Sequence, residues 1–162
     1  MNALDIALHD LFTQILAELR LMQLVLEQEA LGLKDCNAEA VEKIAQEKQA
    51  RAHKLDTLAE CQEHLLRTLN LPAGKEGVEC LLSNLLQTDP TTRNLTTIWQ
   101  DLQNTTVQCR KLNEANGAYI GLLRQHVQRS LDIVHGQPSQ DFVYGPDGVG
   151  RRPMPSRKLL SV

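Results

Sequence analysis

Histidine, cysteine and acidic side chains are the residues through which this sequence could bind a metal ion. Cys61 and His64 lie one helical turn apart and could supply two ligands, but a structural zinc ion needs four. A di-iron centre in a helical bundle needs the pattern Glu-x-x-His twice, and none of the five histidines has glutamate three residues before it. Asp132 before His135 is the nearest approach and stands alone. The spacing therefore predicts no metal site.

The four cysteines, Cys36, Cys61, Cys80 and Cys109, form neither a CxxC pair nor a disulfide framework typical of a secreted protein. We expect them to be small buried apolar residues or exposed thiols. The sequence contains neither the GxxxxGK(S/T) loop that holds phosphates nor the GxSxG turn that carries a nucleophilic serine. We therefore predict no catalytic residue and no cofactor, although side chains distant in sequence can still meet in a triad.

The elements that must position any functional side chain are helices. The chain has 162 residues, of which 28 are Leu and only 15 are Val or Ile, a composition that favours long helices over strands. A net charge of −3 and only five aromatic residues give poor support to a nucleic-acid groove. No stretch has the roughly 18 to 20 uncharged apolar residues of a membrane helix, and no secretory signal is visible, so we expect a cytosolic protein with no membrane insertion.

Two long apolar stripes predict an antiparallel helical hairpin. The first runs from about Asn2 to Leu33 and is expected to end at Gly32, after which Asp35 or Asn37 can cap the next helix. The second runs from about Ala38 to Leu69. Its apolar face is expected to carry Val41, Ile44, Lys48, Ala52, Leu55, Leu58, Cys61, Leu65 and Leu69.

Two more helices are expected after the hairpin. Pro72 with Gly74 and Gly77 ends the second stripe, and a short helix of one to three turns, which would plug an end of the hairpin, follows before residue 90. Asp89 and Pro90 suit the start of a long helix that runs to Val134. A helix of about 45 residues would span about 65 Å, so we expect one of two alternatives, that part of it projects from a compact body or that it breaks.

Asn113, Asn116 and Gly117 interrupt the apolar face of this last helix. A buried amide costs stability unless it is paired, and glycine costs about 1 kcal/mol relative to alanine in a helix interior. One reading is a register-fixing buried amide at a close helix crossing, helped by Gly121 one turn later. The other is a kink or switch point between a packed half and a half that engages a partner.

The last 27 residues, 136–162, differ from the helical body at 1–135. They lack helical periodicity and are rich in glycine, proline and arginine, which predicts an extended, mobile tail. Phe142 and Tyr144 lie in this tail beside Gly145, Asp147 and Gly148. The tail could pack back on the body, or it could be a linear docking motif that orders on a partner.

The order of these features resembles the FlgN family of flagellar type III export chaperones. The resemblance covers essentially the whole chain and rests on Glu29-Ala30-Leu31, Glu47-Lys48, Asn113 to Gly117, the Leu-rich helix to Val134, and Tyr144-Gly145-Pro146-Asp147-Gly148. The segment from about Leu71 to Pro90 departs from the family pattern, because it is longer than the family minimum.

The resemblance implies a cytosolic, non-enzymatic, ATP-independent chaperone of the hook-filament junction proteins FlgK and FlgL. Such a chaperone binds the C-terminal helical region of its cargo and hands it to the export gate protein FlhA. By this analogy the C-terminal part binds cargo, and we assign that role to Tyr119, Ile120, Leu123, Val127, Leu131 and Val134. Docking to the gate falls to Tyr144, with Gly145, Asp147 and Gly148 shaping its turn.

The alternative is a helical coiled-coil scaffold or adaptor that self-associates permanently and carries no export cargo. Apolar stripes at helical spacing serve both roles, so the sequence leaves open whether the chain forms a homo-oligomer when it is free of cargo.

Overall fold

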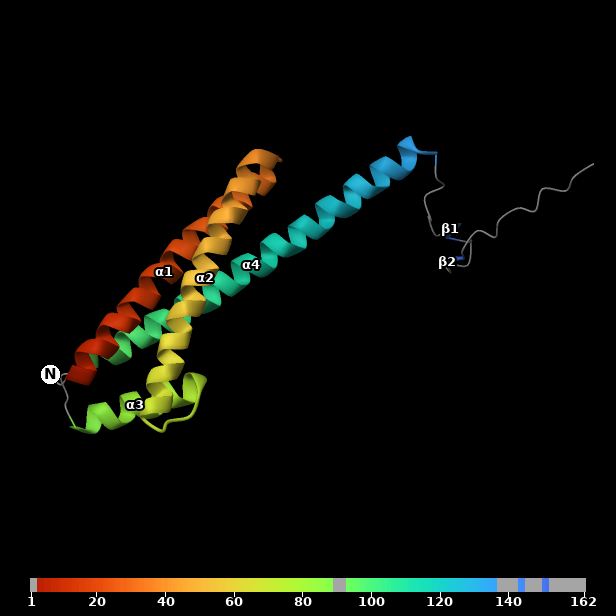
Figure 1. The fold of residues 1–162 in the computed structure, drawn as a ribbon. Coiled ribbons are helices and arrows are strands. Elements are labelled where there is room, and N and C mark those ends of the chain that lie inside the picture. Colours follow the sequence, from red (N-terminus) through yellow and green to blue (C-terminus); the bar gives the residue numbers. More distant parts are fainter. Residues whose placement is uncertain (1–2, 89–92, 137–142, 145–149, 152–162) are drawn as a thin grey trace, which may run out of the picture. The chain divides into compact units, whose positions relative to one another are not determined.

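The computed structural model describes residues 3–88, 93–136, 143–144 and 150–151, and these residues form four helices and two very short strands (Figure 1). The helices are α1 (Ala3–Lys34), α2 (Ala38–Thr68), α3 (Gly74–Thr88) and α4 (Arg93–Val134). β1 (Val143–Tyr144) and β2 (Gly150–Arg151) pair antiparallel, with Val143 opposite Arg151 and Tyr144 opposite Gly150. The predicted hairpin, short helix and long C-terminal helix are therefore confirmed, and the two-residue strands are the addition.

The chain divides into two compact units, residues 1–119 and residues 120–162. The first unit contains α1, α2, α3 and the part of α4 that ends at Tyr119. The second contains the rest of α4 and the strand pair. The boundary after residue 119 is set by contacts between residues, whereas the boundary expected at residue 135 is set by a change in amino-acid composition.

The turn between α1 and α2 is made by Cys36 in a left-handed conformation, with φ of 51°. The backbone N–H groups of Cys36 and Asn37 donate to the carbonyls of Leu33 and Gly32, at 3.3 and 3.1 Å, which is the Schellman arrangement at a helix end. The Asn37 side chain then accepts a hydrogen bond from the Ala40 N–H at 3.1 Å and caps α2. The prediction of Asn37 as a cap is confirmed.

Gly32 was expected to end α1, but it lies inside this helix. A Cβ at this position would lie 3.2 Å from Cγ2 of Val41, so the missing side chain allows α1 and α2 to approach closely beside their turn. The helix instead continues to Lys34.

Gly77 was also expected to lie in a helix-breaking segment, but it lies within α3. A Cβ there would lie 1.8 Å from the carbonyl oxygen of Pro72, so only glycine fits against the preceding loop. Asn70, with φ of 55°, ends α2, and the N–H of Leu71 donates to the carbonyl of Leu66 at 3.0 Å. The 15 residues of α3 make about four turns, one more than the longest helix expected.

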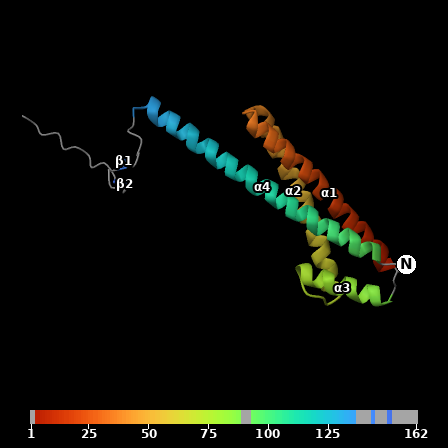
Figure 2. The ribbon, with the colours of Figure 1, turned by 180° about the vertical axis from the view of Figure 1, so that it is seen from behind.

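The core of the first unit lies where α1, α2, α3 and the start of α4 meet. Its fully buried side chains include Phe12, Leu8, Leu66 and Val78, and the ring of Phe12 stacks on Trp99 with centroids 5.4 Å apart. A second, smaller cluster of buried residues contains Leu26, Met22 and Cys109. On α2 the buried residue is Leu66, whereas Cys61, which the sequence placed on the apolar face, is exposed. The view from behind shows the first part of α4 lying along α1 (Figure 2).

α4 is one continuous helix through Gly117, so of the two alternatives expected for this long segment, a break does not occur between Arg93 and Val134. It ends at Val134 and is followed by a turn at Gly136, whose φ is 63° and whose N–H donates to the carbonyl of Ile133 at 3.1 Å. The cap proposed at Asp89 and Pro90 lies outside the described residues. Over the described helices, none is both long enough and apolar enough to cross a bilayer.

Candidate partner-binding surface

One face of α4 is buried in the first unit and exposed in the second. Leu95, Leu102, Cys109 and Asn116 follow one another at intervals of seven residues, and each is at most 8% exposed. A seven-residue interval is nearly two helical turns, so these side chains share a face. The same pattern continues through Leu123, which is half-buried, toward the end of the helix.

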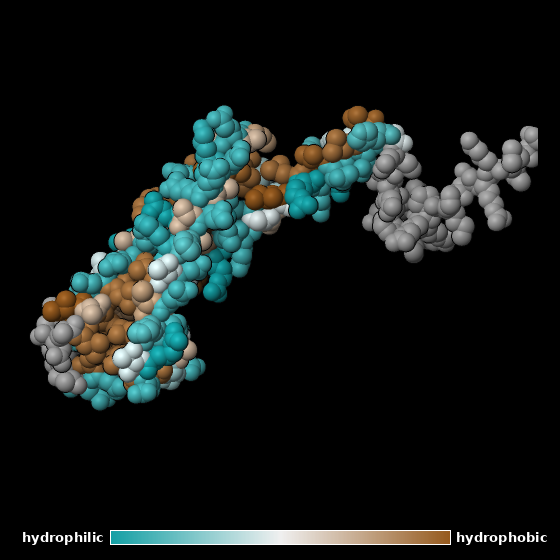
Figure 3. All heavy atoms as spheres, in the orientation of Figure 1, coloured by the Kyte–Doolittle hydropathy of each residue, from teal (hydrophilic) through white to brown (hydrophobic). Residues whose placement is uncertain are grey.

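The residues assigned to cargo binding lie on this continuation. Tyr119 belongs to the first unit and is 38% exposed, while Ile120 and Leu123 are half-buried. Val127, Leu131 and Val134 are exposed to 55, 45 and 79%. Apolar side chains along the last turns of α4 are visible in Figure 3. A helix face with this much exposed apolar surface has the form of a site for another helix.

Two further apolar residues on this segment were missed by the sequence analysis. Leu122 and Ile133 are exposed to 63 and 73%. They lie 11 residues apart, three turns of helix, and so share a face beside the predicted stripe. The signal in the sequence is this 11-residue interval, which lies outside the main stripe of the helix.

A buried polar cluster ends the covered part of the α4 face. Asn116, which is 4% exposed, donates from Nδ2 to the Leu26 carbonyl oxygen at 2.9 Å and to Oε2 of Glu29 at 2.8 Å. Lys48 on α2 donates from Nζ to both carboxylate oxygens of Glu29, at 3.0 and 2.8 Å. Three helices are therefore joined through the Glu29 carboxylate, and the amide is paired rather than orphaned.

The residues near Asn116 bear on the two interpretations of this segment, a buried amide that fixes the helix register and a kink or switch point. Asn113 is exposed, and a Cβ added at Gly117 or Gly121 would meet no atom within 4 Å. Within the first unit, Gly117 therefore does not mark a close helix crossing, which corrects that part of the expectation. The paired amide fits a register-fixing role, and the boundary between the two units falls three residues after Asn116.

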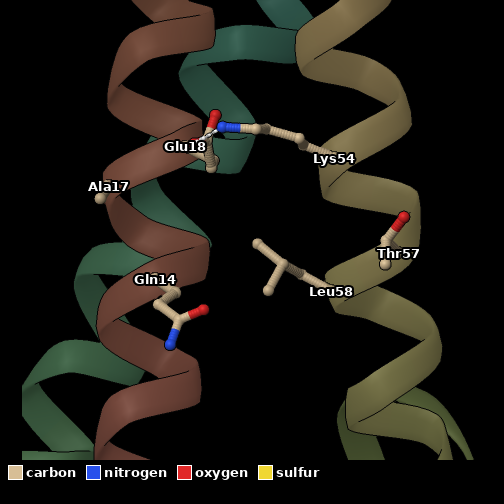
Figure 4. A pocket seen from close by; sticks show the side chains of 6 residues that line it. All are labelled: Gln14, Ala17, Glu18, Lys54, Thr57 and Leu58. Atoms are coloured by element: carbon tan, nitrogen blue, oxygen red, sulfur yellow. Dashed lines mark hydrogen bonds and ion pairs between the residues drawn. The ribbon is translucent and has the colours of Figure 1, made fainter.

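An open groove of about 330 Å³ lies between α1 and α2 in the first unit, lined by Gln14, Ala17, Glu18, Lys54, Thr57 and Leu58. Figure 4 shows Leu58 reaching from α2 into the space between the helices, with Glu18 and Lys54 meeting across one end. Figure 3 shows apolar surface on the same side of the molecule, between α1 and α2 near α3.

Glu18 binds two cations of α2. Its carboxylate accepts hydrogen bonds from Lys54 and Arg51, each at 3.1 Å. Burial raises the pKa of the Glu18 carboxyl, but the hydrogen bonds and charges of Lys54 and Arg51 outweigh this, so its pKa lies below the ordinary value. The groove is thus closed at one end by a charged cluster that links α1 to α2.

The described residues hold no group of three or more His, Cys, Asp or Glu side chains placed to bind a metal ion. Cys36, Cys61 and Cys80 are exposed, and Cys109 is buried. Burial, followed by the charge of Glu27, raises the pKa of the Cys109 thiol, and its Sγ lies 3.5 Å from the carbonyl oxygen of Leu19. Cys109 is therefore an apolar packing residue.

The residues assigned to gate docking are mostly outside the described part of the chain. Tyr144 is the second residue of β1 and is paired in register with Gly150. Gly145, Asp147 and Gly148 lie outside the described residues.

Long paired helices with an exposed apolar helix face define the class of an all-α partner-binding protein. A family model described as FlgN protein matches residues 1–151, and the chain belongs to this family. The FlgN family is a family of flagellar export chaperones, which bind flagellar export substrates. No curated protein and no solved structure matches the chain.

Proposed function

We propose that this protein is a cytosolic, ATP-independent chaperone of the hook-filament junction proteins FlgK and FlgL. In this role it binds their C-terminal helical region, prevents premature assembly and delivers them to the export gate protein FlhA. The observation that supports the cargo role is the exposure of the α4 face at Val127, Leu131 and Val134. Family membership supports the general chaperone role.

The physical basis of the cargo role is the match between two apolar helix faces. Proteins that polymerise through helices expose apolar stripes before assembly, and a chaperone helix with a stripe at the same spacing covers them. Burying one fully exposed Leu or Val side chain is worth about 1.5–3 kcal/mol, so several such residues together contribute free energy of the same order as the cost of association. No nucleotide is needed for binding of this kind.

The proposed gate contact is separate from the cargo face. Tyr144, with Gly145, Asp147 and Gly148, is proposed to dock on the gate, because an aromatic side chain beside turn-forming glycines suits an anchor in a pocket. Replacing Tyr144 with Ala should reduce gate binding and secretion of the junction proteins and leave cargo binding intact. Unchanged gate binding and secretion would remove Tyr144 from this role.

The test of the cargo role is to co-express the full chain with the C-terminal helical segment of a junction protein and measure mass by light scattering. We expect a stoichiometric complex that is lost when the chain is truncated after Ala118. Leu131→Glu should also abolish it, because a charge replaces an exposed apolar contact, while the free protein keeps its helical content. Gln125→Glu, which places the same charge on the other side of α4, is the matched control.

The same experiment distinguishes the scaffold alternative. A chain that elutes alone as a fixed oligomer, with or without the junction segment, would show that the α4 stripe serves self-assembly. Loss of helicity in Leu131→Glu would instead show that this residue belongs to the protein's own core.

A further inference from the structure

α1 carries a second apolar stripe on the side opposite its buried core. Its members follow one another at alternating intervals of three and four residues, and all are exposed: Gln14, Ala17, Leu21, Leu24, Gln28 and Leu31. The exposed fractions of Leu21, Leu24 and Leu31 are 37, 54 and 59%. Alternating steps of three and four are the a and d positions of a coiled coil, so this outward stripe has the pattern of a helix that pairs with another helix.

The charges of α1 beside this stripe fall into two groups. Glu18 and Glu29 are engaged with α2, through Arg51 and Lys54 in one case and Lys48 in the other. On the other flank, Arg20 and Glu27 are the two charged residues between Thr13 and Leu31, and both are exposed. This flank therefore carries one cation and one anion seven residues apart.

We propose that the outward stripe of α1 is the surface through which two copies of this chain associate, with their α1 helices antiparallel. Leu21 of each copy then lies beside Leu24 of the other, and Gln14 and Ala17 meet Leu31 and Gln28 of the second copy. In antiparallel coiled coils the flanking positions before each a residue face one another across the interface. Arg20 accordingly lies beside Glu27 of the second copy, and the two-fold axis repeats the pair.

Charge complementarity selects this arrangement over a parallel one. Parallel helices would place Arg20 near Val25 and Glu27 near Gly32 of the second copy, and both of these residues are buried against the rest of their own unit. Of the two arrangements, only the antiparallel one gives Arg20 and Glu27 each an opposite charge on the second copy, where Glu27 joins the contact that Arg20 makes with Asp101 of its own chain at 3.9 Å. The outward stripe of α1 and its flanking charges are therefore complementary to the same surface on a second copy of the chain.

The size of the surface sets the expected strength. The stripe covers 18 residues, about 27 Å of helix, and its apolar centre is two leucines from each copy. Glutamine and alanine at the other positions weaken the pairing, because they bury less apolar area than leucine. The association should therefore be weak and reversible, and visible as a mass that rises with concentration. It involves α1 alone, so it does not depend on the proposed cargo role of α4.

The test is sedimentation equilibrium of the full-length chain without cargo, over a range of concentrations. We expect a monomer–dimer equilibrium that Arg20→Glu and Glu27→Arg each weaken at least tenfold, because each creates two like-charge contacts. Mixing these two variants should restore the dimer, since one copy then carries two anions where the other carries two cations. The double variant should dimerise like the original chain.

Two charge substitutions elsewhere in the chain serve as matched controls for the dimer test. Arg110→Glu and Glu42→Arg make the same charge changes at exposed sites of α4 and α2, and should leave the dimer unchanged. Leu24→Glu should give a monomer with unchanged helical circular dichroism, which keeps the test valid if a charge reversal at Arg20 disturbs its 3.9 Å contact with Asp101. A chain that stays monomeric at all concentrations, or a Leu24→Glu variant that still dimerises, would overturn the proposal. A mixture of the two charge variants that remains monomeric would overturn the antiparallel register.

Discussion

Asn116 on α4 and Glu29 on α1 are 87 residues apart in the chain, yet Nδ2 of the amide lies 2.8 Å from Oε2 of the carboxylate. Lys48 on α2 binds the same carboxylate. The segments around Glu29, Lys48 and Asn116 are three of the five on which the family resemblance rests, and in the structure they meet at a single point. The polar residues that look out of place along three apolar stripes are thus explained by one another.

Removing the amide should destabilise the first unit. In Asn116→Ala, Glu29 loses one of its two hydrogen-bonding partners in a buried site, so we expect the free energy of unfolding to fall by about 1–3 kcal/mol. Urea unfolding monitored by circular dichroism measures this. Asn113→Ala, three residues away and exposed, is the control and should change stability by less than about 0.5 kcal/mol. Equal losses of stability in the two variants would show that the hydrogen bond from Asn116 to Glu29 does not stabilise the first unit.

Replacing Lys48 should lower the free energy of unfolding far more than replacing a lysine in a surface ion pair. The Glu29 side chain is 5% exposed, so Lys48→Gln leaves a buried carboxylate without its cation, and we expect a loss of about 1–3 kcal/mol. Lys43 forms a 2.8 Å pair with Glu39 in which both side chains are more than 70% exposed. Lys43→Gln should therefore cost no more than about 0.5 kcal/mol. Thermal or urea denaturation of the two variants under the same conditions compares them directly.

The Glu18 cluster should make stability depend on pH in the acid range. Because the pKa of Glu18 is lower in the folded chain than in the unfolded chain, its contribution is full above the unfolded value and is lost as pH falls through the folded one. Glu18→Gln should thus be less stable than the original chain at pH 7, and the difference should shrink below about pH 4. Urea midpoints at pH 7, 5 and 3 provide the measurement. A difference that is independent of pH would contradict the role given to the ionised carboxylate.

Two glycines in helices should respond to alanine in opposite directions. Gly77→Ala would place a Cβ 1.8 Å from the Pro72 carbonyl oxygen, and the backbone shift needed should cost at least about 2 kcal/mol. At Gly117 the added Cβ would meet nothing within 4 Å, so Gly117→Ala should raise stability by up to about 1 kcal/mol. Chemical denaturation of the two variants shows whether each substitution raises or lowers the free energy of unfolding.

Gly117→Ala also tests the reading of this segment as a switch. A kink or switch that needs the flexibility of glycine would lose cargo binding or release when Gly117 is replaced. Unchanged cargo binding in a more stable variant would leave the glycine without such a role.

The sequence by itself determined the helical architecture. Apolar residues in steps of three and four predicted α1, α2 and α4, because such spacing is meaningful only on a helix, and the cap at Asn37 follows from a side-chain acceptor three residues before a free N–H. The same local rules were wrong about Gly32 and Gly77. Glycine signals either a helix end or a close approach, and only the neighbours that a Cβ would meet tell the two apart.

Only the tertiary structure decided which parts of each stripe are covered. Periodicity places Asn116 and Val127 on one face of α4, but it cannot show that Glu29 and Leu26 hold the first while the second is left 55% exposed. Nor could it show that the core of the first unit takes Leu66 of α2 and leaves Cys61 outside. The physical reason is that a helix's own pattern specifies which side is apolar, whereas burial depends on contacts between segments far apart in the chain.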